Sequence, residues 1–122
     1  SNYYQNIIDS KQVNKISEND LYRLEEFIKE NIEQRITIDD LAEKVNMSKF
    51  YFLKEFKKIK QITPYQYILK FKMEKAIDLL MRTDLPLTSI AYNLDFSDQS
   101  HFNNTFKRFY GKSPNKYRLE HQ

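Results

Sequence analysis

The chain has 122 residues and a formal net charge of +3, which is enough length for one domain or two very small ones that share a core. One glycine and three prolines are too few for the turns of an all-β or loop-rich fold, which favours an all-helical fold. With no cysteine and two widely spaced histidines, the sequence has no disulfide or zinc pattern, and we expect neither a metal nor a cofactor.

The charges are distributed unevenly along the chain. Residues 1–48 hold six Lys or Arg against ten Asp or Glu, whereas residues 49–82 hold nine against three and residues 101–118 hold five against none. Clustered cations on an otherwise balanced chain are typical of a surface that binds a polyanion such as nucleic acid. Solvated helix surface is the alternative explanation for either cluster taken alone.

The N-terminal part is predicted to consist of a linker and one helix. Residues 1–18 are polar without a sustained period, and we interpret them as a linker or disordered end. Residues 17–20, SEND, have the pattern of a capping box, and apolar residues then recur at helical spacing, so a helix is expected over about 19–33. The chain shows no apolar run of roughly 20 residues and no signal peptide, which predicts a cytoplasmic protein without a membrane partner.

A short helix, a turn and a longer helix are predicted between residues 37 and 60. Thr37 is the expected N-cap of the short helix, and Ser48 is the expected N-cap of the helix over about 49–60. The apolar residues assigned to the buried side of the longer helix are Phe52, Phe56 and Ile59. The residues assigned to its outer side are Lys49, Phe50, Lys54, Lys57 and Lys58.

The next predicted element is a long helix from Thr63-Pro64 to about Arg82, with proline in the first-turn position that it tolerates. At about 1.5 Å per residue such a helix is roughly 28 Å long. The segment Thr83–Pro86 interrupts the pattern after it.

The same order of elements returns after this break. Residues 89–96, SIAYNLDF, predict a short helix and a tight turn, and Ser97 is the expected N-cap of the helix that follows. The buried stripe of that helix, at positions i, i+4 and i+7, is assigned to Phe102, Phe106 and Phe109. Gly111 ends the helix, and Ser113-Pro114 begins another.

The two segments form an internal repeat. At an offset of 49 residues the aligned pairs are Leu41 with Ile90, Ala42 with Ala91 and Ser48 with Ser97. At an offset of 50 they are Phe52 with Phe102, Phe56 with Phe106 and Lys57 with Lys107. Two copies are too few for a solenoid. The order of elements is that of a helix-turn-helix, whose second helix enters the major groove of DNA.

The segment Leu87–Arg118 resembles the signature of the AraC/XylS-type bacterial transcription regulators. The features that carry the resemblance are Ile90-Ala91, the aromatic Phe96 after the turn, Ser97, the spaced Phe102 and Phe106, Lys107, Gly111, Ser113-Pro114 and Tyr117-Arg118. The resemblance implies an all-α fold in which two helix-turn-helix lobes are joined by a long linker helix, with about seven helices. It also implies sequence-specific binding of double-stranded promoter DNA and regulation of transcription, with RNA polymerase as a further partner.

The resemblance also predicts how the chain is divided. The expected segments are a linker at 1–18, a first lobe at 19–62, the linker helix at 63–83, a second lobe at 84–119 and a tail at 120–122. A rod of about 28 Å would set the two recognition helices near one duplex turn apart, about 34 Å, so that they enter adjacent major-groove segments. Members of the family commonly carry a separate sensing domain, and none is visible in this sequence.

The chain departs from the family pattern at three turns. Asp95 replaces the usual glycine in the second helix-turn-helix, and Asn46 has the equivalent place in the first; both types adopt left-handed backbone more cheaply than other non-glycine residues. Gln61 replaces the glycine that Gly111 supplies in the second copy, so we expect the first recognition helix to end less sharply.

Candidate contacts with DNA follow from the outer faces of the two recognition helices. On the first helix they are Lys49, Phe50, Leu53, Lys54 and Lys57. On the second they are Asp98, Gln99, Ser100, Asn103, Asn104 and Lys107. The candidate phosphate contacts are Ser48, Ser97, Ser113 and Lys116. Asn and Gln pair bidentately with adenine, which predicts a site rich in A·T pairs.

Simpler explanations exist for several of these residues. The serines are helix caps first and phosphate ligands second. Phe50 either contacts a thymine methyl group or bridges to a neighbouring helix. Asp98 either lies at the interface or stabilises the start of its helix through the helix dipole.

Three other functions are weighed. An enzyme is not expected, because the sequence has no paired carboxylates, nucleophile with a base, or glycine-rich phosphate loop. A helical protein-interaction module that docks an acidic partner on the basic faces is the main alternative. Double-stranded RNA is less suited to a groove-reading helix, since its major groove is deep and narrow.

Overall fold

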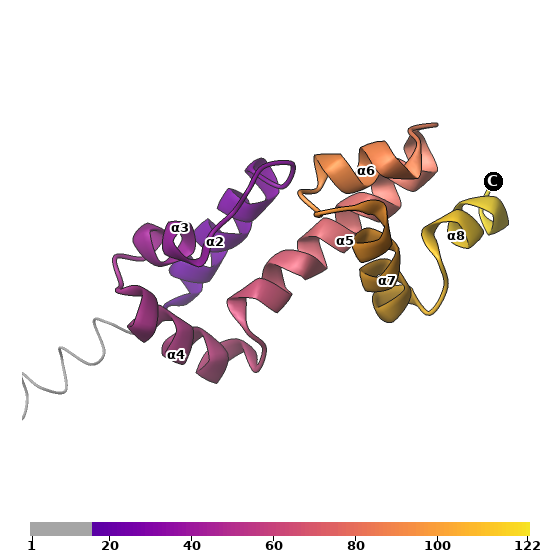
Figure 1. Cartoon of the computed structure of the whole chain (residues 1–122). Coiled ribbons are helices and arrows are strands. Elements are labelled where there is room, and N and C mark those ends of the chain that lie inside the picture. The colour runs from indigo at the N-terminus through magenta and orange to yellow at the C-terminus, as the bar shows by residue number, and fades with distance from the viewer. Residues whose placement is uncertain (1–15) are drawn as a thin grey trace, which may run out of the picture. The chain divides into compact units, whose positions relative to one another are not determined.

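The computed structural model describes residues 16–122, which form seven helices and no strand (Figure 1). The helices are α2 (Glu18–Glu30), α3 (Ile38–Lys44), α4 (Lys49–Lys60), α5 (Pro64–Arg82), α6 (Leu87–Asn93), α7 (Gln99–Tyr110) and α8 (Pro114–Glu120). The all-α prediction and the order of two helix-turn-helix motifs with a long helix between them are confirmed. Most of the expected linker at residues 1–18 lies outside the described residues. None of the described helices combines the length and the apolar character needed to cross a membrane.

The described residues divide into two compact units. The first comprises residues 16–27 and 37–67, and the second comprises residues 28–36 and 68–122. The helix-turn-helix α3–α4 belongs to the first unit and α6–α7 to the second. Two of the three boundaries fall inside α2 and α5, so each of these two helices has residues in both units.

The core of the first unit is built on aromatic residues of α4. Phe52 and Phe56 are fully buried, and the ring of Phe56 meets that of Tyr67 edge-on at 5.1 Å between centroids. The Tyr67 hydroxyl donates a hydrogen bond to Glu25 Oε1 at 2.8 Å, so α2 and α5 are tied together within this unit. Thr37 and Asp40 form a capping box that begins α3, as the sequence predicted for Thr37.

The second unit has a core of the same design. Phe102 and Phe106 are fully buried on α7, and the ring of Phe106 lies 4.8 Å from that of Tyr110 and 5.7 Å from that of Tyr117. The contact between Phe106 and Tyr117 connects α7 with α8. The short helix α6 contributes the buried residues Ile90 and Ala91.

Two residues assigned to the buried stripes are exposed instead. Ile59 has 40% of its surface exposed and Phe109 has 44%, so both assignments were wrong. The buried side of each recognition helix continues through a polar residue, Glu55 in α4 and Thr105 in α7, one helical turn after the first phenylalanine. The core therefore uses positions i, i+3 and i+4, and the residues at i+7 lie beyond its edge.

The turns follow the predicted backbone geometry with one exception. Asn46 and Asp95 have φ values of 56° and 61°, in the left-handed region that their types tolerate. Gln61 also has a left-handed φ of 63°, and its N–H donates to Lys57 O at 2.9 Å, just as that of Gly111 donates to Lys107 O at 2.8 Å. The expectation that α4 ends less sharply than α7 was therefore wrong.

Candidate nucleic-acid interface

The outer face of α4 carries the five predicted contacts of the first helix-turn-helix. All five are exposed; Phe50 has 79% of its surface accessible and Leu53 has 37%. Phe50, Lys54 and Lys57 are spaced i, i+4 and i+7, which places them on the side of α4 opposite the buried Phe52 and Phe56. The five side chains therefore form one surface, called here the α4 face: Lys49, Phe50, Leu53, Lys54 and Lys57.

The α4 face is strongly basic because the single acidic residue of α4 lies on the buried side of the helix. Helix α4 contains five lysines and a single glutamate, Glu55, which is 5% exposed on the buried side. Glu55 Oε1 lies 3.5 Å from the Nζ of Lys58, so its charge is directed away from the face. The lysines of the α4 face are left with an uncompensated positive field, which attracts a polyanion.

The outer face of α7 has the equivalent geometry and a different chemistry. Ser100, Asn104 and Lys107 are exposed at i, i+4 and i+7, and Gln99 and Asn103 flank them with their side chains half-buried. These five residues are called here the α7 face. At the offset of 50 that relates the two helices, the pairs are Lys49 with Gln99, Phe50 with Ser100, Leu53 with Asn103, Lys54 with Asn104 and Lys57 with Lys107. One face is thus cationic and apolar, and the other is dominated by amides.

The N-cap of α7 is Asp98 and not Ser97. The backbone N–H of His101 donates to Asp98 Oδ1 at 2.7 Å, whereas the Ser97 hydroxyl lies 3.3 Å from His101 Nδ1. The prediction of Ser97 as the cap was wrong, because α7 begins one residue later and the side-chain oxygen of Asp98 accepts from the N–H three residues on. The explanation of Asp98 as a helix-start residue is the one that the geometry bears out.

The remaining predicted phosphate contacts lie at helix starts. Ser48 Oγ accepts a hydrogen bond from the Tyr51 N–H, and Ser113 Oγ accepts one from the Lys116 N–H, each at 3.2 Å. Both serines are the N-caps that the sequence predicted. Lys116 is exposed, with its Nζ 4.0 Å from Glu120 Oε1. Contact of these residues with phosphate stays a prediction.

Two residues of the second unit that were not predicted as DNA contacts, Arg118 and Lys72, affect its stability in opposite directions. The Arg118 guanidinium donates to three backbone carbonyls, those of Leu80 at 3.1 Å, Leu85 at 2.7 Å and Thr83 at 3.3 Å. Lys72 is 7% exposed. Its Nζ lies 5.7 Å from the ring centroid of Phe96, which is in the turn between α6 and α7. Burial lowers the pKa of Lys72 below its ordinary value, and the nearby Asp95 carboxylate opposes this shift. Arg118 was visible only as part of the family signature.

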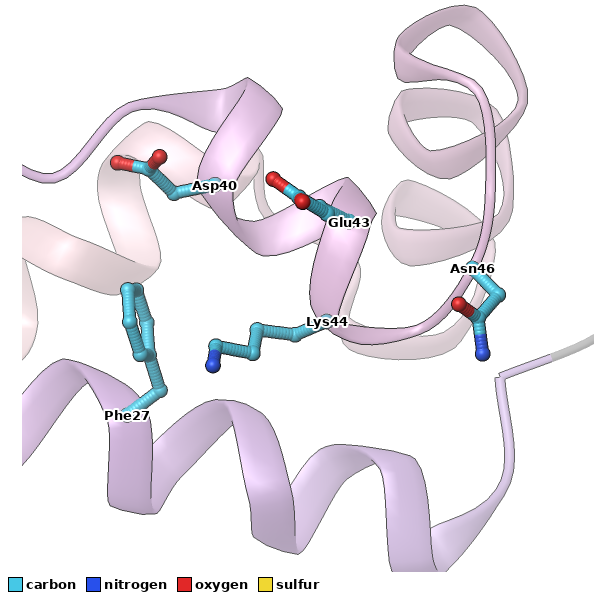
Figure 2. Close-up of a pocket in the computed structure, with 5 residues that line it drawn as sticks. All are labelled: Phe27, Asp40, Glu43, Lys44 and Asn46. Atoms are coloured by element: carbon cyan, nitrogen blue, oxygen red, sulfur yellow. The ribbon is translucent and has the colours of Figure 1, made fainter.

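An open pocket of about 510 Å³ lies between α2 and α3 of the first unit, lined by Phe27, Asp40, Glu43, Lys44 and Asn46 (Figure 2). The side chain of Lys44 extends toward Phe27, with Nζ 4.8 Å from the ring centroid (Figure 2). Asp40 is already engaged, since its Oδ2 accepts the Thr37 N–H at 2.9 Å. No residue of the α4 face lines this pocket.

Comparison with known proteins places this geometry in a family. A family model described as a helix-turn-helix domain matches residues 41–120. The melibiose operon regulatory protein of Escherichia coli is 37% identical over 92 residues, which are 75% of this chain and 30% of that protein. The chain spans less than half the length of this and two other curated regulators that it matches.

Solved structures show the same fold. The C-terminal domain of AraT, a response regulator from Geobacillus stearothermophilus, is 32% identical with a TM-score of 0.75, over 86% of this chain and 87% of that one. An AraC-type transcriptional regulator from Chromobacterium violaceum is 25% identical with a TM-score of 0.78, over 84% of this chain and 92% of that one. The chain belongs to the AraC/XylS-type family of helix-turn-helix transcription regulators.

Proposed function

We propose that this chain binds double-stranded DNA sequence-selectively, with α4 and α7 each entering the major groove, and so regulates transcription from promoters. The observation that carries the proposal is the α4 face: a helix-turn-helix places three lysines on the exposed side of its second helix, where a duplex is read. The proposed DNA-binding lobes are residues 19–62 and 84–119, joined through 63–83; they differ from the two compact units, since residues 28–36 belong to the second unit. We propose that the protein binds DNA in the cytoplasm and does not act as an enzyme.

The α4 face is suited to phosphates and methyl groups. Lys49, Lys54 and Lys57 supply point charges, which strengthen binding to any sequence. Phe50 is 79% exposed, and an accessible aromatic ring next to lysines can pack against the C5-methyl group of thymine. Helix α4 contains no Asn, Gln or Arg, so it lacks a side chain for bidentate pairing with a base edge.

The α7 face supplies the side chains that α4 lacks. Gln99 and Asn104 carry amides that can pair with adenine, and Lys107 supplies a phosphate contact one helical turn further on. Ser48, Ser97, Ser113 and Lys116 are the further phosphate contacts, since N–H groups and hydroxyls at helix starts bind anions. We infer that RNA polymerase is a further partner of the promoter-bound protein.

Selection of bound sites from random duplex DNA tests the proposal. The expected result is a defined motif with two separately conserved segments, followed by competition in which an unrelated duplex displaces the protein poorly. Lys54→Ala should weaken binding to the selected site, and Arg23→Ala, which removes an exposed charge from α2, is the matched control. Recovery of random sequences, with binding retained only to an acidic protein or a charged polymer, would favour a protein-interaction module instead.

A further inference from the structure

Asn103 has a side-chain oxygen that the fold does not use. Among the described residues, its Oδ1 is the buried side-chain atom without a hydrogen-bond partner. A buried acceptor without a partner destabilises a fold, and such groups are few in native proteins. The equivalent position of α4 is Leu53, an apolar residue that leaves no such group. Helix α7 thus has an amide at the position where α4 has a leucine.

The orientation of the Asn103 amide decides what it can offer to DNA. With Oδ1 buried, the amide nitrogen is the atom left for a partner outside the fold. The opposite orientation would bury an NH₂ group without an acceptor, and orphaned N–H donors are rarer than orphaned carbonyls. Bidentate pairing with adenine requires both amide atoms at the base edge. Asn103 therefore has one atom to offer, whereas the exposed Asn104 can present both.

We propose, on the basis of the function argued above, that Asn103 and Asn104 read DNA in different ways. Asn103 donates a single hydrogen bond from Nδ2 to the N7 of a purine, the acceptor that adenine and guanine share in the major groove. It selects purine over pyrimidine without separating the two purines. Asn104 pairs bidentately and carries the preference for adenine. In the DNA site, Asn103 thus sets a base position that accepts either purine, and Asn104 sets a position that prefers adenine.

The first measurement is thermal unfolding of Asn103→Leu, which installs the residue of the equivalent α4 position. Because the change removes the buried oxygen without a partner, the melting temperature should rise or stay unchanged while binding to the selected site weakens. A clear fall in melting temperature with unchanged binding would assign Asn103 to the fold and overturn the proposal.

The second measurement uses base analogues in the half-site read by α7. Each purine of that half-site is replaced in turn by the other purine and by its 7-deaza analogue, which lacks the N7 acceptor. Asn103→Ala should weaken binding about threefold to tenfold, equally for adenine and guanine at its position, and should have no further effect on the 7-deaza duplex. Asn104→Ala should weaken binding strongly with adenine and weakly with guanine at its own position.

The outcomes separate this proposal from the function on which it rests. If the wild-type protein binds no duplex selectively, the proposed function fails. If it binds selectively but the Asn103→Ala loss is confined to adenine, the amide is bidentate and the inference is wrong. An Asn103→Ala loss that persists on every 7-deaza duplex would assign the residue to the phosphate backbone and also overturn it.

Discussion

A single arginine closes the connection between α5 and α6. Arg118 donates from its Nε and both terminal nitrogens to the carbonyls of Leu80, Leu85 and Thr83, groups at and beyond the C-terminus of α5 that the helix itself leaves unpaired. The positive charge also complements the negative end of the helix dipole. One side chain therefore satisfies three backbone acceptors of the second unit.

Arg118→Ala is expected to lower the free energy of unfolding of the second unit by about 2–4 kcal/mol, since three carbonyls lose a charged donor. Arg118→Lys should recover little of this loss, because an ammonium lacks the planar arrangement of donors. Urea unfolding followed by far-UV circular dichroism measures both variants. Arg108→Ala is the control: Arg108 is exposed, with one weak contact of 3.5 Å to Thr105 Oγ1, and its loss should be within about 0.5 kcal/mol of wild type.

Lys72 is a buried cation whose removal should stabilise the fold. Its pKa is lowered by burial, so the charged form is less favourable in the folded state than in the unfolded chain. Lys72→Met keeps the length of the side chain without the charge, and at pH 7 it should raise the free energy of unfolding by up to about 1 kcal/mol. Lys70→Met, at an exposed position of the same helix, should not raise the free energy of unfolding.

The pH dependence of the Lys72→Met gain follows from the direction of the shift. Between the lowered folded-state pKa and the ordinary value of 10.5, the unfolded chain binds the proton more strongly than the folded one. The stability contributed by this residue in the wild type therefore rises with pH through that window. The gain from Lys72→Met should shrink as the pH increases from 7 toward 10; a gain that is constant with pH would show that the cost is steric and not electrostatic.

Burial was predicted correctly for the first two phenylalanines of each stripe and wrongly for the last residue of each. Phe52, Phe56, Phe102 and Phe106 are all fully buried, because their spacing of four residues marks one side of a helix. Ile59 and Phe109 continue the same pattern but lie past the edge of each small core. Glu55 and Thr105 were missed because polar residue types are rarely buried. The spacing of apolar residues shows which side of a helix faces the core, but it does not show how far along the helix burial continues.

At the scale of helices, the two recognition helices end in the same way with different residues. Gly111 has a φ of 77°, and a Cβ added to it would meet no atom within 4 Å, so only backbone strain opposes a side chain there. Gln61 already adopts this conformation at φ 63°, and its Nε2 donates to Lys58 O at 2.9 Å. This side-chain bond compensates part of the strain.

Substitutions at the two helix ends should change the free energy of unfolding by different amounts. Gly111→Ala is expected to lower the free energy of unfolding by about 1 kcal/mol, through strain alone. Gln61→Gly should change it by less than about 1 kcal/mol, because relief of strain is opposed by the lost hydrogen bond and by the greater freedom of glycine in the unfolded chain. Chemical denaturation of the two variants checks the comparison. A loss at Gln61→Gly as large as that at Gly111→Ala would show that the hydrogen bond dominates.

The position of an N-cap could not be fixed from residue types. Ser97 and Asp98 are both good capping residues, and alignment of the repeats at an offset of 49 favoured Ser97. In the structure Asp98 is the cap, which restores a single offset of 50 from Ser48 through the whole recognition helix. The extra residue therefore lies in the turn before α7 and not inside it. Only the backbone hydrogen bond to His101 distinguishes the two candidates.

At the scale of the molecule, the sequence and its resemblance to a family predicted the repeat, the order of the helices that residues 16–122 form, and the exposed face of α4. It did not predict that the compact units divide inside α2 and α5, because periodicity marks a helix without showing which core each turn joins. It also treated Asn103 and Asn104 alike. The difference between them is the direction of one amide, which depends on packing and not on spacing.

The whole-molecule consequence of the α4 face is the dependence of DNA affinity on salt. Each lysine that neutralises a phosphate releases counterions, so the logarithm of the binding constant falls linearly with the logarithm of salt concentration. For six to ten phosphate contacts, affinity should fall by roughly 10³- to 10⁵-fold between about 50 and 200 mM salt. An affinity that stays flat over this range would contradict DNA as the partner.

Replacing Lys49 and Lys54 together by alanine should reduce the magnitude of the salt slope by about 2 and weaken binding to specific and non-specific duplexes alike. The matched control is Arg23→Ala with Lys44→Ala, which removes the same charge from α2 and α3 of the same unit. Fluorescence anisotropy at four salt concentrations measures both slopes. Because the control variant has the same net charge, equal slopes for the two would show that only total charge matters. A smaller slope for the α4 variant alone would locate the phosphate contacts on the α4 face. Footprinting should then show the loss in one of the two protected segments, since α7 keeps its own contacts.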